Sequence, residues 1–237
     1  MMKMLEIQNL RGGYIPDLDI LQGIDLALYQ GETVGIIGLN GSGKSTLGRA
    51  VMNMIPRREG AILYCGEDVS MLATHELAAR GIAIMQQGGQ VFRMLSVWEN
   101  LQIAFGDNSK NEYIAVLKEI VPLLAYPKRE LQRTMADKLS GGQRHQLALA
   151  MTLARQPRLA ILDEPSAGLS PVAVVEMYDI LQQVRTRLGV TMLLIEQNIA
   201  KAMEFCNRSI LLAQGHIVNE FTDGTIADIE KIMFNKK

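Results

Sequence analysis

The chain has few cysteines, almost no net charge and no long apolar run. Only Cys65 and Cys206 are cysteines among the 237 residues, and two thiols so far apart in sequence fit neither a disulfide framework nor a metal cluster. The 24 basic and 25 acidic residues leave a formal charge of −1, which gives no overall basic field to attract nucleic acid. No apolar run approaches the roughly 18 residues of a membrane span, and the N-terminus lacks the apolar core of a signal peptide. These absences predict a cytosolic protein with reduced thiols that does not cross a membrane by itself.

A glycine-rich stretch near the N-terminal end gives the clearest functional signal. It follows the strand-like residues 33–37, precedes apolar residues at helical spacing, and matches the pattern G-x-x-x-x-G-K-[ST]. In such a loop the backbone N–H groups face a bound phosphate, the glycines permit positive φ, and the next helix adds the positive end of its dipole. Lys44 is expected to reach the outer phosphates, and the Ser45 hydroxyl to ligate Mg²⁺. We predict a nucleotide phosphate site formed by Gly38, Leu39, Asn40, Gly41, Ser42, Gly43, Lys44, Ser45 and Thr46.

Two adjacent carboxylates, Asp163 and Glu164, follow the continuous apolar run of residues 159–162. Such a run is typical of a buried parallel strand, and open α/β sheets bind their ligands at the carboxyl ends of these strands. Asp163 is predicted to hold Mg²⁺ through water opposite Ser45, and Glu164 to act as general base on the attacking water. Taken alone, the pair could be an ordinary acidic strand end; the phosphate loop favours the functional interpretation.

A second glycine turn, Ser140-Gly141-Gly142-Gln143, begins a helical pattern 23 positions before Asp163. A turn of this kind at a helix N-terminus is another anion site. One chain can hardly wrap one phosphate group with two such sites so far apart in sequence. We therefore expect a head-to-tail dimer, in which the Ser140 turn of each chain closes over the nucleotide of its partner.

The remaining pattern alternates strands with helices, which predicts an α/β fold around a parallel sheet. β elements dominate the beginning of the chain. Capping boxes at Ser96-x-x-Glu99 and Ser109-x-x-Glu112 predict that roughly residues 91–139 form a helical insertion.

With these motifs in place, the chain resembles the ATP-binding subunits of ABC transporters over essentially its whole length. The resemblance implies a P-loop NTPase core with a parallel sheet, an N-terminal antiparallel β subdomain and an inserted helical subdomain. It implies one ABC-type ATPase domain over residues 1–237, with ATP and Mg²⁺ as cofactors.

The resemblance also implies roles for two residues outside the loops. Tyr14 matches the aromatic residue that stacks on adenine; the alternative is an ordinary tyrosine in a surface loop. Gln87 matches the glutamine that contacts Mg²⁺ and the attacking water. Gln86 and Gln90 are alternatives, although Gln87 better fits the register of the neighbouring residues. Residues 166–171 match the segment that crosses the dimer interface.

One position departs from the general family pattern. Most members carry a histidine that contacts the γ-phosphate two residues after the strand ending at Ile195, and here that position is Gln197. Glutamine can donate a hydrogen bond but cannot be cationic or relay a proton. Slower hydrolysis, or reliance on the partner's site, would follow.

The sequence around Gln197 also resembles one subgroup, the shorter ATPase subunit of branched-chain amino acid and related amide importers. Residues 97–101 and 163–171 look like that subgroup as well, whereas residues 86–90 and the segment after Gly224 depart from it. The subgroup implies transmembrane permease subunits, contacted around residues 87–98, and a second ATPase subunit in a heterodimer or a homodimer. It further implies a substrate-binding protein, a peripheral location at the cytoplasmic face of the membrane, and no direct nucleic-acid partner.

Three alternatives keep the fold and change the function. The chain could serve an exporter, or it could be a non-transport ATPase that acts on nucleic acid or ribosomes. The interval of about one hundred residues between the two glycine turns, without sustained heptads, argues against chromosome-maintenance relatives. Gln197 also raises the possibility of an idle, ATP-clamped partner, against which Glu164 argues. The histidines have no metal-ligand spacing and are expected to be solvated: His75, His145 and His216.

Overall fold

The computed structural model describes residues 2–105 and 112–222. The predicted capping box at Ser109 and the segment after Gly224 lie outside the described residues. Within the described ranges, no helix is both long and apolar enough to span a membrane.

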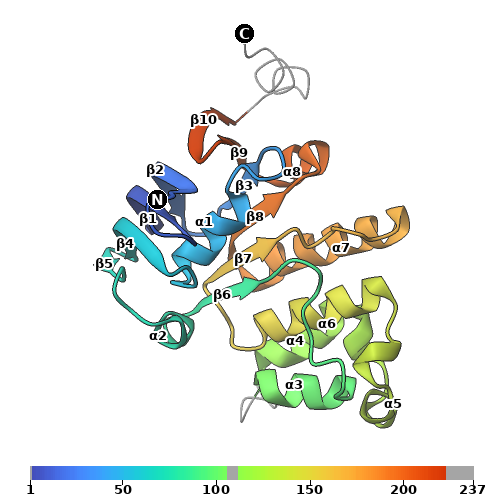
Figure 1. Cartoon of the computed structure of the whole chain (residues 1–237). Helices are drawn as coiled ribbons and strands as arrows, with labels where there is room; N and C mark the ends of the chain where they lie inside the picture. Colours follow the sequence, from blue (N-terminus) through green and yellow to red (C-terminus); the bar gives the residue numbers. More distant parts are fainter. Residues whose placement is uncertain (1, 106–111, 223–237) are drawn as a thin grey trace.

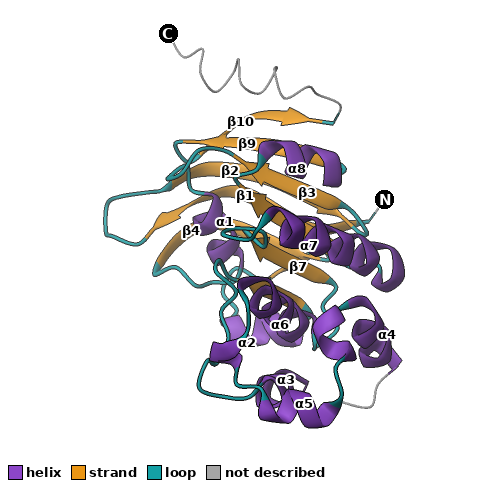
Figure 2. Ribbon diagram, turned by 90° about the vertical axis from the view of Figure 1, so that its right-hand side faces the viewer, coloured by secondary structure: helices purple, strands orange, loops and turns teal. Residues whose placement is uncertain are grey.

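A six-stranded sheet forms the centre of the molecule, in the order β10-β9-β3-β8-β7-β6 (Figures 1 and 2). All neighbouring strands are parallel except β10, which runs antiparallel to β9. The strands are β3 (Thr33–Ile37), β6 (Ile82–Met85), β7 (Leu159–Asp163), β8 (Thr191–Glu196), β9 (Arg208–Ala213) and β10 (His216–Phe221).

The apolar runs predicted as buried strands are buried on both faces of this sheet. Successive residues of β7 enter two different cores: Leu159 and Ile161 face one, whereas Ala160 and Leu162 face the other. The first core lies against α1 (Lys44–Val51) and the antiparallel sheet, and the second lies against the helices α6 (Gly141–Leu153) and α7 (Pro171–Gln183). Burial on both faces explains why these strands are continuous apolar runs and do not alternate.

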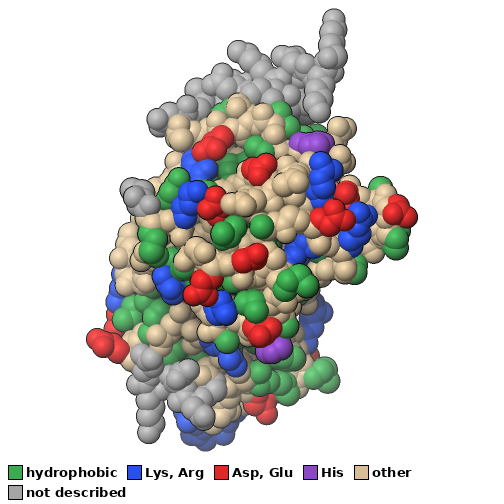
Figure 3. Space-filling view, turned by 90° about the vertical axis from the view of Figure 1, so that its left-hand side faces the viewer, with side chains coloured by type: hydrophobic (Ala, Val, Ile, Leu, Met, Phe, Trp, Pro, Cys, Tyr) green, Lys and Arg blue, Asp and Glu red, His purple; other side chains and the backbone are tan. Residues whose placement is uncertain are grey.

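The antiparallel sheet at the N-terminal end has the order β2-β1-β4-β5. Its strands are β1 (Lys3–Gly13), β2 (Leu21–Tyr29), β4 (Arg57–Tyr64) and β5 (Glu67–Asp68). β1 extends as far as Gly12 and Gly13, which still pair with neighbouring strands. A short helix, α2 (Thr74–Ala79), leads from this sheet to β6. On the face drawn in Figure 3, acidic and basic side chains are interspersed.

Helices follow β6 and form the lower part of the molecule in Figure 1. Ser96 caps the first of them as expected, since its hydroxyl accepts from the Glu99 backbone N–H at 3.2 Å and the Ser96 backbone N–H donates to the Glu99 carboxylate at 2.7 Å. The helices are α3 (Val97–Phe105), α4 (Glu112–Ile120), the 3-10 turn η2 (Pro122–Ala125), α5 (Lys128–Arg133), η3 (Ala136–Lys138) and then α6. The predicted α/β fold with an antiparallel β subdomain and an inserted helical subdomain is confirmed.

After β7 the chain forms α7, which continues as a π-helical turn, η4 (Val184–Leu188), and stops at Gly189 with φ 64°. α8 (Ile199–Phe205) follows β8, and Figure 2 shows α7 and α8 across the same face of the sheet. Because β3, β8 and β7 are parallel neighbours, their carboxyl ends meet at one edge. That edge carries the phosphate loop, the Asp163-Glu164 pair and Gln197.

Candidate functional site

The phosphate loop connects the buried strand β3 to α1. Gly38, Gly41 and Gly43 adopt φ values of 153°, 78° and 104°, as the loop pattern predicts. At Gly38 a β-carbon would lie 2.2 Å from the carbonyl oxygen of Leu212, so no other residue fits there. No side chain caps α1, so its first N–H groups remain available to an anion.

Lys44 lies within this loop and is only 5% exposed. Its ammonium group donates hydrogen bonds to the carbonyl oxygens of Gly38 at 2.9 Å and Leu39 at 3.0 Å. Burial lowers the pKa of Lys44, while the Glu164 and Asp163 carboxylates act in the opposite direction. A phosphate group would give this buried cation an anionic partner.

Ser45 and Asp163 meet as the sequence predicts. The Ser45 hydroxyl donates to Oδ1 of Asp163 at 2.8 Å, while Oδ2 of Asp163 is buried without a hydrogen-bond partner among the described residues. Burial raises the pKa of Asp163, and the Ser45 hydrogen bond opposes that rise. A hydroxyl and a carboxylate with a free oxygen suit Mg²⁺, which usually takes one or two protein ligands together with phosphate and water. The described residues hold no cluster of three or more His, Cys, Asp or Glu side chains that could bind a metal without such help.

Glu164 lies next to Asp163 and is held on both sides by amides. Gln87 donates from Nε2 to one carboxylate oxygen at 2.5 Å, and Gln197 donates from Nε2 to the other. The Glu164 backbone has φ 51° and donates its N–H to the carbonyl of Ile195 at 2.9 Å. The strained φ and the two amides fix the carboxylate at the edge of the sheet.

These groups surround a pocket of about 350 Å³ above the phosphate loop. The pocket brings together residues from five separate parts of the chain, and sequence reasoning missed one of them, Ile20. Ile20 lies between β1 and β2, where no motif marks it. The lining residues are Ile20, Asn40, Gly41, Gly43, Lys44, Ser45, Thr46, Gln87, Glu164 and Gln197.

Tyr14 follows β1 and does not line this pocket, although it is connected to the same helix. The Arg49 guanidinium, one turn after Ser45 on α1, donates to the Tyr14 hydroxyl at 3.2 Å. The ring is 39% exposed. The contact with Arg49 was not foreseen, because residues 14 and 49 share no sequence pattern.

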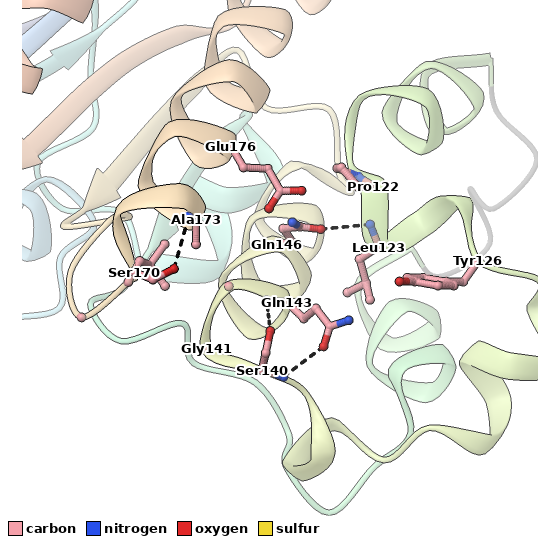
Figure 4. A pocket seen from close by; sticks show the side chains of 13 residues that line it. Pro122, Leu123, Tyr126, Ser140, Gly141, Gln143, Gln146, Ser170, Ala173 and Glu176 are labelled. Carbon is pink, nitrogen blue, oxygen red and sulfur yellow. Dashed lines mark hydrogen bonds between the residues drawn. The ribbon is translucent and has the colours of Figure 1, made fainter.

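The Ser140 turn lies at the N-terminus of α6 and is a reciprocal capping box. The Gln143 N–H donates to the Ser140 hydroxyl at 3.2 Å, and the Gln143 side chain accepts from the Ser140 N–H at 3.0 Å. Figure 4 shows this turn facing α7 across a second pocket, with Tyr126 and Glu176 on its walls. The pocket has a volume of about 500 Å³ and shares no lining residue with the first. One chain therefore does not bring the two glycine turns into one site.

The expectation that every histidine is solvated is wrong for His145, which is 6% exposed. His145 lies one turn after Gly141, on the inward face of α6, and its Nδ1 is 3.0 Å from the Gly141 carbonyl. The ring packs against Gly89 of the loop that follows Gln87, where a β-carbon would come within 3.1 Å of Nδ1. Packing against Gly89, a distant part of the chain, decides the burial, and ligand spacing alone could not reveal it.

Comparison with known proteins agrees with this geometry. A family model described as "ABC transporter" matches residues 21–167, more than half of the chain. The lipopolysaccharide export system ATP-binding protein LptB of Escherichia coli K12 is 31% identical over 90% of this chain and 88% of its own length. The probable branched-chain amino acid transport ATP-binding protein LivF of Archaeoglobus fulgidus is 34% identical over 96% of both chains.

The structural similarity extends over the full length. The ADP conformation of MJ1267, an ATP-binding cassette of an ABC transporter, matches with a TM-score of 0.80 and 25% identity, covering 100% of this chain and 96% of that one. The predicted resemblance, including its likeness to branched-chain amino acid transport ATP-binding proteins, is confirmed. The chain belongs to the ABC transporter family, in which it is an ATPase subunit.

Proposed function

We propose that this chain hydrolyses ATP to power solute import through separate transmembrane permease subunits, with branched-chain amino acids or similar small polar solutes as cargo. The observation that carries the catalytic part is the Glu164 carboxylate, held by Gln87 and Gln197 at the wall of the phosphate-loop pocket. The cargo is suggested by the branched-chain amino acid transport relatives. Export is the second candidate, because LptB is 31% identical over 90% of the chain.

In this proposal each site residue predicted from the sequence has a defined task. Residues 38–46 bind the phosphates, and Lys44 neutralises the outer ones. Ser45, Asp163 and Gln87 hold Mg²⁺, which supplies charge neutralisation at the phosphates. Glu164 accepts the proton of the attacking water, while Gln87 and Gln197 orient its carboxylate. Tyr14 stacks on the adenine.

The separate pocket at the Ser140 turn supports a dimer as the active form. Ser140, Gly141, Gly142 and Gln143 of one subunit would cover the nucleotide of the other, in a pair of identical or related subunits. The whole of residues 1–237 acts as one ATPase domain in this proposal.

We assign the permease contact to three exposed apolar residues on two neighbouring segments, which together are called the apolar patch: Phe92, Met94 and Met135. Phe92 and Met94 are 52% and 81% exposed and lie in the loop that follows Gln87. The Ala136 N–H donates to the Leu95 carbonyl at 2.9 Å, which brings Met135 beside this loop. An apolar patch so close to Gln87 would link the permease to the nucleotide pocket. The protein would then be peripheral to the cytoplasmic face of the membrane, in a complex that includes a substrate-binding protein and no nucleic acid.

An affinity pull-down from detergent-solubilised native membranes tests the transport proposal. Recovery of polytopic membrane proteins with a second ATPase subunit supports it, and loss of that recovery in Phe92→Ser/Met94→Ser would assign the contact. The control is Met71→Ser, because Met71 is an exposed methionine on the connection to α2. It detects any general effect of removing a surface methionine. Recovery of ribosomes or DNA alone would refute transport while leaving the ATPase intact.

A further inference from the structure

Glu196 is a buried carboxyl group at the end of β8, the strand between the phosphate-loop strand and the Asp163 strand. It is 2% exposed and pairs in register with Ile37, the last residue before the phosphate loop. Burying a carboxyl group is costly unless hydrogen bonds compensate it. Nothing in the proposed hydrolysis uses Glu196, so its burial requires an explanation.

Donors from two different segments bind this carboxyl group, and the Tyr178 hydroxyl and the Asn198 N–H also stabilise its charged form. The Ser166 hydroxyl donates to Oε1 at 2.7 Å, and the backbone N–H of Gln197 donates to Oε2 at 3.2 Å. Burial raises the pKa of Glu196, whereas the Ser166 hydrogen bond lowers it. Lys44 is the phosphate-loop cation whose charge interacts with Glu196.

The Ser166 and Gln197 donors both lead back to Glu164. Ser166 lies in the turn that follows Glu164, in which the Ala167 N–H donates to the Glu164 carbonyl at 3.1 Å and the Leu169 N–H to the Ser166 carbonyl at 3.3 Å. The Gln197 side chain donates directly to the Glu164 carboxylate. Glu164, Ser166, Glu196 and Gln197 therefore form a closed ring of covalent and hydrogen-bonded links.

We propose that Glu196 is a positioning residue that couples residues 166–170 to Gln197. When a partner subunit packs on residues 166–170, this coupling changes the position of Gln197 and so its hydrogen bond to the Glu164 carboxylate. The coupling rests on the proposed dimer and on Glu164 as general base. Gly168 and Leu169 line the second pocket with the Ser140 turn, so the segment is exposed where that dimer would form. If the partner moves Ser166, the buried Glu196 carboxyl group moves with the Ser166 hydroxyl and shifts the backbone of Gln197, which donates to the same carboxyl group.

The test uses the full chain and three substitutions in the ring. Glu196→Leu removes both acceptors, and Ser166→Ala removes one donor. Glu196→Gln restores both contacts, because the amide oxygen can accept from the Gln197 N–H while the amide nitrogen donates to the Ser166 oxygen. Thr191→Val is the matched control, since Thr191 is 0% exposed on the same strand and accepts from the Gly31 N–H at 2.9 Å, at the opposite end from the site.

The readouts are kcat and KM for ATP, ATP affinity and the thermal midpoint. We expect Glu196→Leu and Ser166→Ala each to lower kcat about tenfold, the equivalent of one net hydrogen bond, with ATP affinity within about twofold of the parent. Glu196→Gln should recover kcat to within about threefold, and the double variant Ser166→Ala/Glu196→Leu should be no slower than the slower single variant. Thr191→Val should lower the thermal midpoint with kcat unchanged.

Three results would overturn the coupling. The first is a kcat loss in the double variant that equals the product of the two single losses. The others are an unchanged kcat in the Glu196→Leu and Ser166→Ala variants, or an equal kcat loss in Thr191→Val. Should Glu196→Leu fail to fold, Ser166→Ala and Glu196→Gln decide the question by themselves, because each keeps the packed volume. The variant Glu164→Gln distinguishes failure of this coupling from failure of the proposed ATPase mechanism. If Glu164→Gln is inactive and the ring variants equal the parent, only the coupling fails; if Glu164→Gln is fully active, the general-base assignment fails first.

Discussion

The substitution Glu164→Gln tests the proposed site most directly, because it changes one atom in a crowded environment. In the structure each oxygen of the Glu164 carboxylate accepts a hydrogen bond from a different amide. The substituted amide offers one acceptor oxygen and one donor nitrogen, so either Gln87 or Gln197 must turn its own amide to keep a hydrogen bond to it. One of the two hydrogen bonds is lost or reversed in direction, and the proton acceptor for water is lost.

Two effects set the expected magnitude. Loss of a positioned general base costs about 10²- to 10⁴-fold in rate. Loss of one hydrogen bond to a charged group costs about 1.5–3 kcal/mol, which is roughly 10- to 150-fold. The two losses overlap because they concern the same carboxylate, so we expect the ATPase rate to fall by about 10²- to 10⁴-fold with ATP affinity retained.

Phosphate release at saturating ATP measures the rate, titration with a fluorescent ATP analogue measures affinity, and size-exclusion chromatography with ATP detects trapped dimers. Glu67→Gln is the control, since the Glu67 carboxylate pairs with Arg80 at the surface and its side chain is 73% exposed. A Glu164→Gln variant that hydrolyses ATP within tenfold of the parent would refute the assignment. Loss of nucleotide binding together with activity would instead indicate that the substitution damages the phosphate loop.

Three further predictions concern other residues. Tyr14→Ala should weaken ATP binding by about tenfold. Tyr14→Phe keeps the ring and loses the hydroxyl that contacts Arg49, so its ATP affinity should stay within about twofold of the parent. Equal losses of affinity in the two variants, measured by nucleotide titration, would exclude stacking. Ser45→Ala leaves the buried Asp163 carboxylate without the Ser45 hydroxyl donor, so the free energy of unfolding should fall by about 1–3 kcal/mol. Half-maximal hydrolysis should also need more Mg²⁺. An unchanged Mg²⁺ titration would exclude Ser45 as a metal ligand. Burial raises the pKa of the Cys206 thiol from 9.0 to about 12, so it should resist alkylation at pH 8 in the folded protein and react on unfolding, as followed by mass spectrometry. The folded thiol holds its proton more tightly than the unfolded one. Its contribution to the free energy of unfolding should therefore be constant below about pH 9 and decline as the pH rises from 9 towards 12. Denaturant titrations in which the Cys206→Ala variant shows the same decline would contradict this.

The sequence predicts those parts of the site that are continuous in the chain. The phosphate loop is such a part, because Gly38, Gly41 and Gly43 need positive φ whatever surrounds them. The run before Asp163 is another, since a strand buried on both faces is apolar throughout.

The parts that sequence reasoning missed depend on which strands become neighbours. Ser166 and Glu196 are 30 positions apart, and Arg49 and Tyr14 are 35 apart, so neither pair leaves a local pattern. The burial of His145 depends on Gly89, which reaches α6 only after β6 has joined the sheet. All three contacts depend on how distant elements pack together, and no periodicity in the sequence encodes that packing.

That same order has a consequence for synthesis on the ribosome. The antiparallel sheet is complete once residue 68 has emerged, so it can pair its strands early. β3, by contrast, has only β8 and β9 as neighbours, and both are translated roughly 150 residues later, a delay of about 8 to 30 s at 5–20 residues per second. Throughout that interval the apolar strand Thr33–Ile37 lacks both of its sheet partners. In a nascent chain that stops before Thr191, the backbone N–H and C=O groups of β3 therefore have neither of their strand partners, although the whole phosphate loop has already been made.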